Sequence, residues 1–501
     1  MLGNNWRSGI QTALTFDDVL MIPQYSTIES RNDCIVETYC SQNIKLKTPF
    51  ISSPMDTVTE TEMAIHMAAN GGLGVIHRFM TTNEQVEQIK KVKRSEAYIK
   101  NRPFVVGLNF TLQRVLILAE EWKCKTFLVT DDNLIENNED YEETDETGSP
   151  RYKSIPLLGI ITNRDCYEQP LNKLVKELMT PRDKLVTLHY LDVSKENARQ
   201  KMLSHKLEKL PVVDDKNNIK GLINLKDLKV DSELKVLDQM GRLIVGGAVG
   251  ASDDEITRAK KLVNSGCDVI VLDVANGHCQ LALRTVEQLK KELSVDVIAG
   301  SIATGDGAKR MIQAGADGIR CGIGNGSICI TRVVSGCGVP QFSALMDVAP
   351  VCKEYKIPLM SDGGNKNSGN MCKALAVGAD CIMLGRLLAG CQESPSKEIY
   401  REGKILKVYR GMAGFGANVS KAQRTGKDEP SSTGFSPEGV EGYIPFAGRV
   451  SIVLQQFKRG IQSGMSYCGA SNIAELQKNV QFIQMTNAGF VESGVHGITK
   501  I

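Results

Sequence analysis

A glycine-rich loop holds the residues of this sequence that are best suited to chemistry. Residues 322–332 read Gly-Ile-Gly-Asn-Gly-Ser-Ile-Cys-Ile-Thr-Arg and directly follow a short apolar run. Glycines at alternate positions allow sharp turns that expose backbone amides, which can hold a phosphate, and carbonyls, which can hold a monovalent cation. Cys329 lies inside this loop, and the nearby Arg332 would favour a nucleophilic thiolate. A purely structural cysteine is the alternative.

The elements that must position this loop follow a repeated pattern. Apolar runs of four to six residues bounded by Gly or Asp predict strands buried on both faces of a parallel sheet; examples are 268–273, 295–300, 318–322, 358–362 and 381–385. Windows such as 253–265 and 305–314 predict helices between them. Polar residues or glycines follow nearly every predicted strand, and the unit recurs every 50 to 60 residues or so. An α/β fold of the (β/α)8 barrel type is therefore favoured over a doubly wound sheet.

A second repeat interrupts this pattern. Residues 127–133 and 158–165 are echoed by 210–216 and 220–227, each pair reading as strand, Asp-rich turn and strand. The duplication resembles a tandem pair of cystathionine-β-synthase-type (CBS) modules, with Met179-Thr180-Pro181 opening the second copy. We therefore expect a catalytic barrel made of 1–94 and 231–501, with flap and tail, and a regulatory CBS pair over 95–230. An acidic stretch, 136–146, is expected to be a solvated loop.

The overall composition excludes several classes of partner. The 60 Lys and Arg residues nearly balance 58 Asp and Glu, for a net charge of +2, so no nucleic-acid partner is expected. The sequence has no apolar run of 18 residues and its first residues lack a signal-peptide core, which predicts no membrane association and a cytoplasmic location. Thr499-Lys500-Ile501 loosely resembles a peroxisomal signal, so a peroxisome-like organelle is the alternative location.

The motifs along the chain resemble those of the IMP dehydrogenase and GMP reductase family. The resemblance covers the barrel from 16–20 to the tail 491–496 and includes the Gly-x-Gly-x-Gly-Ser-x-Cys-x-Thr-Arg loop, and the CBS pair occupies the family's usual place. Further matching segments are Ser53-Pro54-Met55-Asp56-Thr57-Val58, Ser361-Asp362-Gly363-Gly364, Met383-Leu384-Gly385, Tyr409-Arg410-Gly411-Met412 and Glu438-Gly439-Val440. The resemblance implies that Cys329 attacks C2 of a purine nucleotide and forms a covalent adduct.

The resemblance also implies the binding residues. The 5′-phosphate would contact Ser327, Gly364, Gly385 and Tyr409, with Arg386 where many relatives have Ser, and the ribose would contact Asp362. The base would contact Met55, Gly411 and Met412, and Ser53 would also bind the substrate. Asp273 would contact the nicotinamide nucleoside, and Asn276 and Ser301 would also bind the cofactor. For Asp273 a helix N-cap is the alternative role. Potassium would be held by carbonyls of Gly324, Gly326 and Cys329, completed by Glu492, Ser493 and Gly494 from a neighbouring subunit of a homotetramer, possibly an octamer.

Two reactions are known in this family, and a mobile flap distinguishes them. IMP dehydrogenase oxidises IMP to XMP with NAD and hydrolyses its adduct with an Arg-Tyr pair, whereas GMP reductase converts GMP to IMP and ammonia with NADPH. Here Thr425 follows Arg424, and no Tyr occurs between Tyr409 and Tyr443. These residues favour GMP reductase, with IMP dehydrogenase as the alternative because 53–60 and the CBS pair are dehydrogenase-like.

The reductase interpretation gives Thr331 and Glu438 the task of protonating and releasing ammonia. Glu438 as an ordinary surface charge of the flap is the alternative. His278 and His496 are expected to be polar packing residues. A non-catalytic purine nucleotide sensor is a remote third possibility. We expect the CBS modules to bind regulatory purine nucleotides, namely ATP, GTP or GMP.

Overall fold

The computed structural model describes residues 10–95, 99–100, 103–121, 124–134, 143–144, 150–151, 155–193, 195–228, 234–426 and 436–495. The chain forms two compact units. Unit 1 consists of Met1–Lys93, Ser232–Val236 and Leu243–Ile501, and unit 2 consists of Arg94–Asp231 and Leu237–Arg242. Within the described residues, none of the helices combines the length and the apolar character needed to cross a lipid bilayer.

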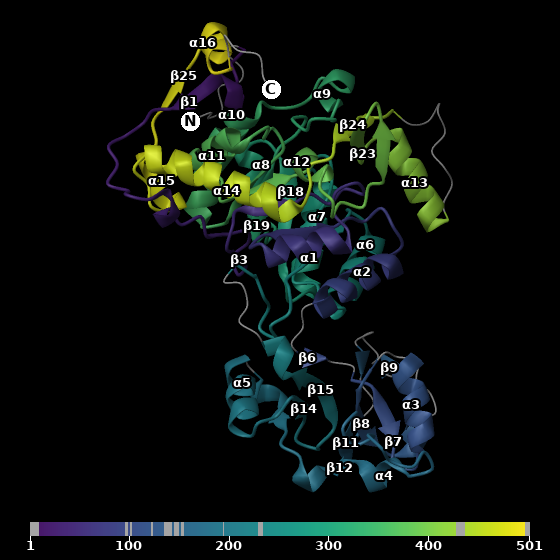
Figure 1. The fold of residues 1–501 in the computed structure, drawn as a ribbon. Helices are drawn as coiled ribbons and strands as arrows, with labels where there is room; N and C mark the ends of the chain where they lie inside the picture. Colours follow the sequence, from purple (N-terminus) through teal and green to yellow (C-terminus); the bar gives the residue numbers. More distant parts are fainter. Residues whose placement is uncertain are drawn as a thin grey trace. The chain divides into compact units, whose positions relative to one another are not determined.

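Eight parallel strands close a barrel in unit 1, which confirms the predicted (β/α)8 fold (Figure 1). Their side chains are almost all buried, as the short apolar runs require, because helices cover the outside and side chains fill the inside. In order around the barrel the strands are β16 (Gly246–Val249), β17 (Val269–Leu272), β18 (Asp296–Ile302), β19 (Gly318–Cys321), β20 (Leu359–Asp362), β21 (Cys381–Leu384), β4 (Phe50–Ser52) and β5 (Leu73–Ile76).

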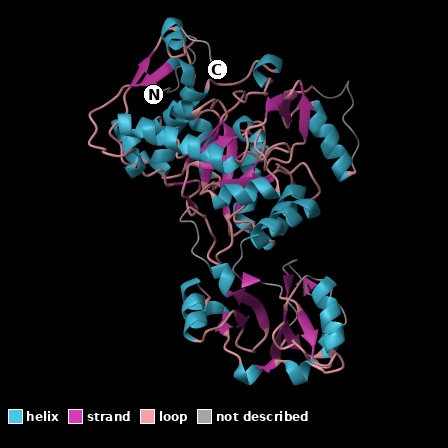
Figure 2. Cartoon of the chain, viewed as in Figure 1, coloured by secondary structure: helices cyan, strands magenta, loops and turns pink. Residues whose placement is uncertain are grey.

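Amphipathic helices surround these strands (Figure 2). α6, for example, buries Ile256, Ala259 and Leu262 and exposes Asp253, Asp254, Lys260 and Lys261. The helices are α1 (Thr61–Ala69), α2 (Thr82–Ser95), α6 (Asp253–Asn264), α7 (Gln280–Glu292), α8 (Gly305–Gln313), α10 (Gln341–Tyr355), α11 (Ser368–Ala376) and α14 (Val450–Tyr467), with the short α9 (Thr331–Val334) and α12 (Arg386–Ala389).

Three repeated turns brace neighbouring strands at the amino ends of the barrel. The turns end in Asp268, Asp317 and Asp380, which directly precede β17, β19 and β21. Each carboxylate accepts a hydrogen bond from a backbone N–H at the start of the adjacent strand; the donors are Val245, Val297 and Leu359, at 2.7, 2.7 and 2.8 Å. The Gly and Asp repeat noted in the sequence is therefore a structural clamp at the end of the barrel opposite the strands' carboxyl ends.

Smaller elements extend the barrel where the sequence predicted a flap and a tail. An antiparallel sheet of β22 (Glu398–Arg401), β23 (Lys404–Arg410) and β24 (Glu441–Pro445) follows α12, and α13 (Phe415–Thr425) lies between its last two strands in the sequence. Near the carboxyl terminus, α15 (Ile473–Asn479) and α16 (Asn487–Glu492) flank β25 (Phe482–Gln484), which pairs with β1 (Val19–Met21). β23 and α13 supply walls of the cavity described below.

Unit 2 contains two four-stranded sheets with the same pattern of pairing. One has the order β12-β11-β8-β7 and the other β6-β15-β14-β13, each with one parallel and two antiparallel pairs. Their strands are β7 (Val105–Gly107), β8 (Thr126–Thr130), β11 (Gly159–Thr162) and β12 (Thr180–Pro181), then β13 (Leu188–His189), β14 (Lys209–Val213), β15 (Ile219–Asn224) and β6 (Ile99–Lys100). The helices of this unit include α3 (Leu112–Glu121), α4 (Val175–Leu178) and α5 (Lys195–Ser204).

The two sheets of unit 2 exchange their edge strands. β6 precedes the first copy in the sequence but pairs with β15 of the second, and β12 precedes the second copy but pairs with β11 of the first. Of the predicted acidic loop, only 143–144 is described, in a two-stranded pairing of β9 (Glu143–Thr144) with β10 (Pro150–Arg151). His496 and Thr499-Lys500-Ile501 lie outside the described residues.

Candidate active site

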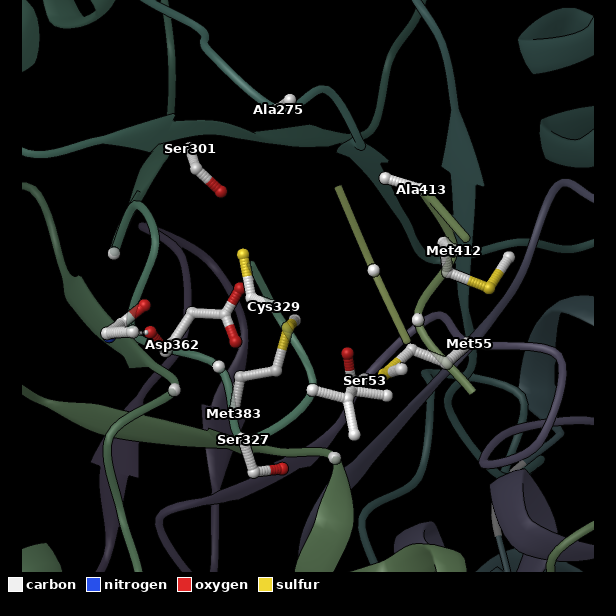
Figure 3. A pocket seen from close by; sticks show the side chains of 18 of the residues that line it. Ser53, Met55, Ala275, Ser301, Ser327, Cys329, Asp362, Met383, Met412 and Ala413 are labelled. Carbon is white, nitrogen blue, oxygen red and sulfur yellow. Dashed lines mark hydrogen bonds between the residues drawn. The ribbon is translucent and has the colours of Figure 1, made fainter. Parts of the chain in front are cut away.

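A cavity of about 520 Å³ lies where β4, β17, β19, β20 and β21 end. Figure 3 shows the Cys329 side chain pointing into it, with Asp362 on one side and Met412 and Ala413 on the other. The cavity brings together most of the residues predicted from the sequence: Ser53, Met55, Asp273, Ser301, Gly324, Gly326, Ser327, Cys329, Thr331, Asp362, Gly364, Gly385, Arg386, Tyr409, Gly411, Met412 and Glu438.

Two amides hold the glycine-rich loop over the ends of β19 and β20. The Asn325 side-chain amide donates to Gln341 Oε1 at 2.6 Å and to the Asp362 carbonyl at 2.8 Å. Gln341, which is buried, donates to the Cys321 carbonyl at 2.9 Å. At Gly322, where φ is +151°, a Cβ would lie 2.1 Å from the Asp362 carbonyl oxygen, so only glycine permits this approach. The loop is thereby fixed relative to the barrel.

A continuous hydrogen-bonded relay runs from the loop to the later flap segment. Cys329 Sγ lies 3.1 Å from Thr331 Oγ1, which donates to Glu438 Oε2 at 2.7 Å. The backbone reinforces this geometry, since Ile330 donates to the Glu438 carbonyl at 2.8 Å and Val440 donates to the Ile328 carbonyl at 3.0 Å. A half-buried thiol, a hydroxyl and a carboxylate in line can exchange protons with a group bound at the sulfur.

Ser53, Met55 and Tyr409 form another part of the cavity with Gly385. Tyr409 is buried, and its pKa is raised to about 12 because burial outweighs a hydrogen bond with Ser327. The phenol therefore stays protonated and can donate. A Cβ at Gly385 would lie 3.0 Å from the Tyr409 hydroxyl and 3.3 Å from Met55 Sδ, so the missing side chain keeps this corner open. Such a corner suits a ligand group that accepts hydrogen bonds.

A buried arginine connects two of the three acidic residues of the cavity. Arg320, only 4% exposed, donates to Asp273 Oδ1 at 3.1 and 3.2 Å, and its Nε lies 3.7 Å from Asp362 Oδ2. Burial raises the pKa of Asp362, Arg320 opposes this increase, and Asp273 adds to it. The Nε atoms of Arg78 and Arg320 have no hydrogen-bond partner in the described structure, although both residues line the cavity. The predicted helix N-cap alternative for Asp273 has no support here, since its carboxylate is engaged by arginines.

Some predicted residues lie elsewhere. Asn276 is exposed, does not line the cavity in the described structure, and accepts a hydrogen bond from the His278 N–H at 3.0 Å. His278 Nε2 lies 3.2 Å from Asp306 Oδ2. Arg332 donates to the Val339 carbonyl at 2.6 Å rather than to a group beside Cys329. The second half of the predicted potassium site lies at the end of α16 in the same chain, outside the cavity: Glu492, Ser493 and Gly494.

Several charged residues of the site were not predicted from the sequence. Arg320 could have been noticed, because it is the one charged residue in an otherwise apolar strand. Arg78 and Lys421 could not have been noticed in this way. Arg78 follows a strand, and Lys421 lies on an ordinary amphipathic helix. Cationic side chains in the lining outnumber acidic ones: Arg78, Arg320, Lys366, Arg386 and Lys421 against Asp273, Asp362 and Glu438. The cavity therefore favours an anionic ligand such as a phosphate ester.

Comparisons with known proteins agree on one family. Residues 13–496 match the family model described as IMP dehydrogenase / GMP reductase domain. The chain is 41% identical over 491 residues to an inosine-5′-monophosphate dehydrogenase of Nitrosopumilus maritimus (97% of this chain, 98% of the relative). It is 40% identical over 498 residues to a GMP reductase of Leishmania major (97% of each chain).

The solved structures include GMP reductase from Trypanosoma brucei in two complexes. A cysteine-to-alanine variant bound to guanosine 5′-monophosphate superposes with a TM-score of 0.84 at 38% identity and covers 99% of this chain and 100% of that one. The complex with guanosine 5′-triphosphate gives a TM-score of 0.73 at 34% identity, over 97% of this chain and 100% of that one. Both family activities are thus represented among proteins that match the chain over almost its whole length.

Proposed function

The chain belongs to the IMP dehydrogenase / GMP reductase family, and we propose that it is a GMP reductase. Members of this family are oxidoreductases that act on purine nucleotides with a nicotinamide cofactor. The proposed reaction is the NADPH-dependent conversion of GMP to IMP and ammonia through a covalent adduct on Cys329. Identity alone does not choose between the two activities, because the dehydrogenase and reductase relatives are 41% and 40% identical to the chain.

The residues at the end of α13 favour GMP reductase over IMP dehydrogenase. Hydrolysis of an adduct needs a group that activates water, and the family's dehydrogenases use an Arg-Tyr pair in this region. Here the corresponding positions hold Arg424 and Thr425. Thr425 donates its hydroxyl to the Lys421 carbonyl at 2.7 Å within the helix, and the Arg424 guanidinium donates to Glu60 at 3.0 Å. Both side chains are therefore engaged away from Cys329, which supports a reaction without a hydrolytic step.

The relay gives the residues their roles in the proposed mechanism. The Cys329 thiolate forms a bond to C2 of GMP, and the amino group at C2 leaves with the electron pair of its broken bond. Glu438, acting through the Thr331 hydroxyl, supplies the proton that lets this group depart as ammonia. When a hydride is then added to C2, the carbon–sulfur bond breaks, its electrons return to Cys329, and IMP is released.

The residues around Asp273 fit a nicotinamide group. Asp273 offers an acceptor, Ser301 a hydroxyl, and Arg320 a buried Nε–H without a hydrogen-bond partner in the described structure, and all three line one cavity with Cys329. A bound NADPH would supply the hydride that this cavity delivers to C2. The Gly385 corner, with the Tyr409 hydroxyl and Ser327, would receive the 5′-phosphate, and Asp362 would accept hydrogen bonds from the ribose.

A paired assay tests the assignment. Purified chain with GMP and NADPH should lose absorbance at the nicotinamide band and release ammonia, and the Cys329→Ala variant should be slower by roughly 10⁴-fold or more, because the nucleophile is gone. Cys337→Ala is the matched control, since Cys337 is exposed in the same region and forms no part of the relay. Absorbance gain with IMP and NAD, and none lost with GMP and NADPH, would establish the dehydrogenase instead. No absorbance change in either assay would leave only the interpretation as a non-catalytic nucleotide sensor.

Two further proposals concern partners. We propose that the duplicated module of unit 2 is a CBS pair that binds ATP, GTP or GMP and regulates the barrel; the GTP complex of the T. brucei relative supports a purine nucleotide as ligand.

We also propose a homotetramer in which carbonyls of Gly324, Gly326 and Cys329 hold potassium with a neighbouring subunit's tail. The Gly326 carbonyl already accepts the Cys329 N–H at 3.1 Å, which leaves one lone pair for a cation.

A further inference from the structure

A fully satisfied carboxylate lies just before α1, outside the cavity. Glu60 Oε1 accepts hydrogen bonds from His77 Nε2 at 3.1 Å and from Arg424 Nη1 at 3.0 Å, and Oε2 accepts one from Gln88 Nε2 at 3.0 Å. Burial alone would raise the pKa of Glu60, but the hydrogen bonds from His77 and Arg424 outweigh it and lower the pKa below its usual value. Glu60 is therefore ionised at neutral pH.

The orientation of Glu60 is set from the barrel. His77 is fully buried, and its Nδ1 accepts the Phe79 backbone N–H at 3.1 Å. Because a backbone amide can only donate, the hydrogen of the neutral ring is on Nε2 and points at Glu60. Gln88 of α2 holds the second oxygen. His77 and Gln88 thus fix the orientation of the Glu60 carboxylate independently of Arg424.

Arg424 connects this carboxylate to α13. It lies in the last turn of that helix, where a cation is favourable, and its Nε is 3.7 Å from Glu84 Oε1. Glu84 is itself held at the start of α2, where its Oε2 accepts from the Thr81 N–H at 2.8 Å and hydroxyl at 2.9 Å. One guanidinium therefore joins the end of α13 to the beginnings of α1 and α2.

α13 in turn forms part of the cavity wall. Asn418 and Lys421 line the cavity, whereas Arg424 is absent from the lining as far as the structure is described. Asn418 donates to the Met412 carbonyl at 3.1 Å and to the Gly414 carbonyl at 2.9 Å, so it also fixes the segment proposed to contact the base. Lys421 Nζ lies 4.8 Å from the centroid of the Phe79 ring. A shift of α13 would move both lining residues and loosen Met412.

We infer that Glu60 and Arg424 are positioning residues that anchor α13 and thereby place Asn418, Lys421 and Met412 around the bound nucleotides. Neither touches the reacting atoms, and their effect reaches substrate through α13. The inference rests on the proposed function in one respect, namely that no hydrolytic step requires Arg424 to leave Glu60 during turnover. The anchoring itself concerns the fold and can be measured without reference to which reaction is catalysed.

Variants of the full chain test the anchor. Arg424→Gln and Glu60→Gln should each speed amide hydrogen exchange in residues 415–425 by about tenfold and raise KM for GMP and NADPH by about tenfold, with kcat reduced less than about threefold. The double variant should be no worse than either single one, because the pair acts as a unit. Arg424→Lys should restore part of both effects. Arg401→Gln, which removes an exposed arginine paired with Glu402, is the control and should change none of these quantities.

Two results would overturn the inference. Unchanged exchange in 415–425 with kcat lowered about a hundredfold or more in Arg424→Gln would mean that Arg424 acts on the reacting groups. Additive effects of the two substitutions would mean that they are not coupled. If Glu60→Gln fails to fold, the partly exposed Arg424 still allows the exchange test. A wild-type chain that oxidises IMP would refute the proposed function, while the exchange and coupling results would still decide the anchor.

Discussion

Thr331 occupies the central position of the relay. Its hydroxyl has one hydrogen, which it donates to Glu438, so the oxygen faces Cys329 with its lone pairs. A proton can then pass from sulfur to carboxylate, or back to a leaving amine, by two short transfers. The residue two positions after the nucleophile is thus suited to ammonia release because the loop places it beside both partners.

Glu438→Gln tests that transfer. The amide can still accept a hydrogen bond from Thr331, but it cannot take up or return a proton. We expect ammonia release from GMP, measured in a single turnover without NADPH, to slow by about 10²–10⁴-fold, with GMP binding retained. Glu402→Gln, at an exposed position of unit 1, is the control. An unchanged rate of release would assign the proton to another group.

At this scale the sequence predicted what the family's motifs encode and missed what only tertiary contacts create. Cys329, Thr331 and Glu438 come together as expected, although Glu438 is far along the chain. Asn325 and Gln341 were not predicted, because they have no role of their own in the reaction. They matter because they donate hydrogen bonds to backbone carbonyls at the ends of two strands. Arg332 neighbours Cys329 in sequence but turns to Val339, which residue spacing could not show.

The three Asp turns of the barrel differ in one respect. Lys93 and Lys290 form ion pairs at 2.6 Å with Asp268 and Asp317, whereas in the described part of the chain no Lys or Arg pairs with Asp380. Burial therefore raises the pKa of Asp380 to about 6, against a hydrogen bond from Leu359 that lowers it. Of the three Asp turns, the one that ends in Asp380 therefore holds a carboxyl whose pKa is close to neutral pH.

This difference predicts a pH-dependent effect on stability. Because the pKa of Asp380 is raised in the folded state, its contribution is fully present below about pH 4 and is lost as pH rises through about 6, by about 3 kcal/mol. Asp380→Asn should remove this loss, so the difference in Tm between variant and wild type should grow in favour of the variant from pH 5 to pH 8. Thermal scans at fixed ionic strength measure it.

Asp317→Asn is the matched control for that experiment. It removes a carboxylate paired with Lys290, so it should destabilise the protein at both pH values. A Tm difference for Asp380→Asn that does not change with pH would contradict the assignment.

Barrel strands were predictable because each is a short apolar run bounded by Gly or Asp, buried on both faces. The sheet of β22, β23 and β24 was not predicted. β22 and β24 are mostly exposed, and none of the three strands has a long apolar run. Lys407 of β23 is buried, and it donates to carbonyls of Cys391 and Ser394 at 2.8 and 2.9 Å. A lysine that reads as a surface residue is thus part of the core.

On the scale of the molecule, the candidate active site and the duplicated module lie in different units. Every residue that lines the candidate active-site cavity belongs to unit 1, and unit 2 has apolar clusters of its own, such as the one around Leu188, Met202 and Ile223. Units with separate cores can fold separately. The duplication was readable from repeated strand and turn segments, whereas the exchange of two-residue edge strands depends on pairing between distant segments and was not.

Replacing residues 97–230 by a short Gly-Ser linker should separate the two functions. We expect the shortened chain to reduce GMP with kcat within about threefold of the full chain, because its cavity is complete. Calorimetry should detect ATP binding to the full chain and none to the shortened one. ATP binding that survives the deletion would place the regulatory site in the barrel.

The pairing of β6 with β15 has a consequence for how the barrel tolerates so large an insert. Lys100 lies opposite Leu222 and Ile99 opposite Ile223 in an antiparallel pair, so the two ends of the segment 99–223 lie side by side. Loop-closure entropy depends on the freedom of the chain between two fixed ends and costs about 0.6 kcal/mol per doubling of a flexible loop. Because backbone hydrogen bonds hold the two ends of the segment 99–223 together, these residues add little to the closure entropy of the connection between α2 and β16, which depends on the residues outside the segment.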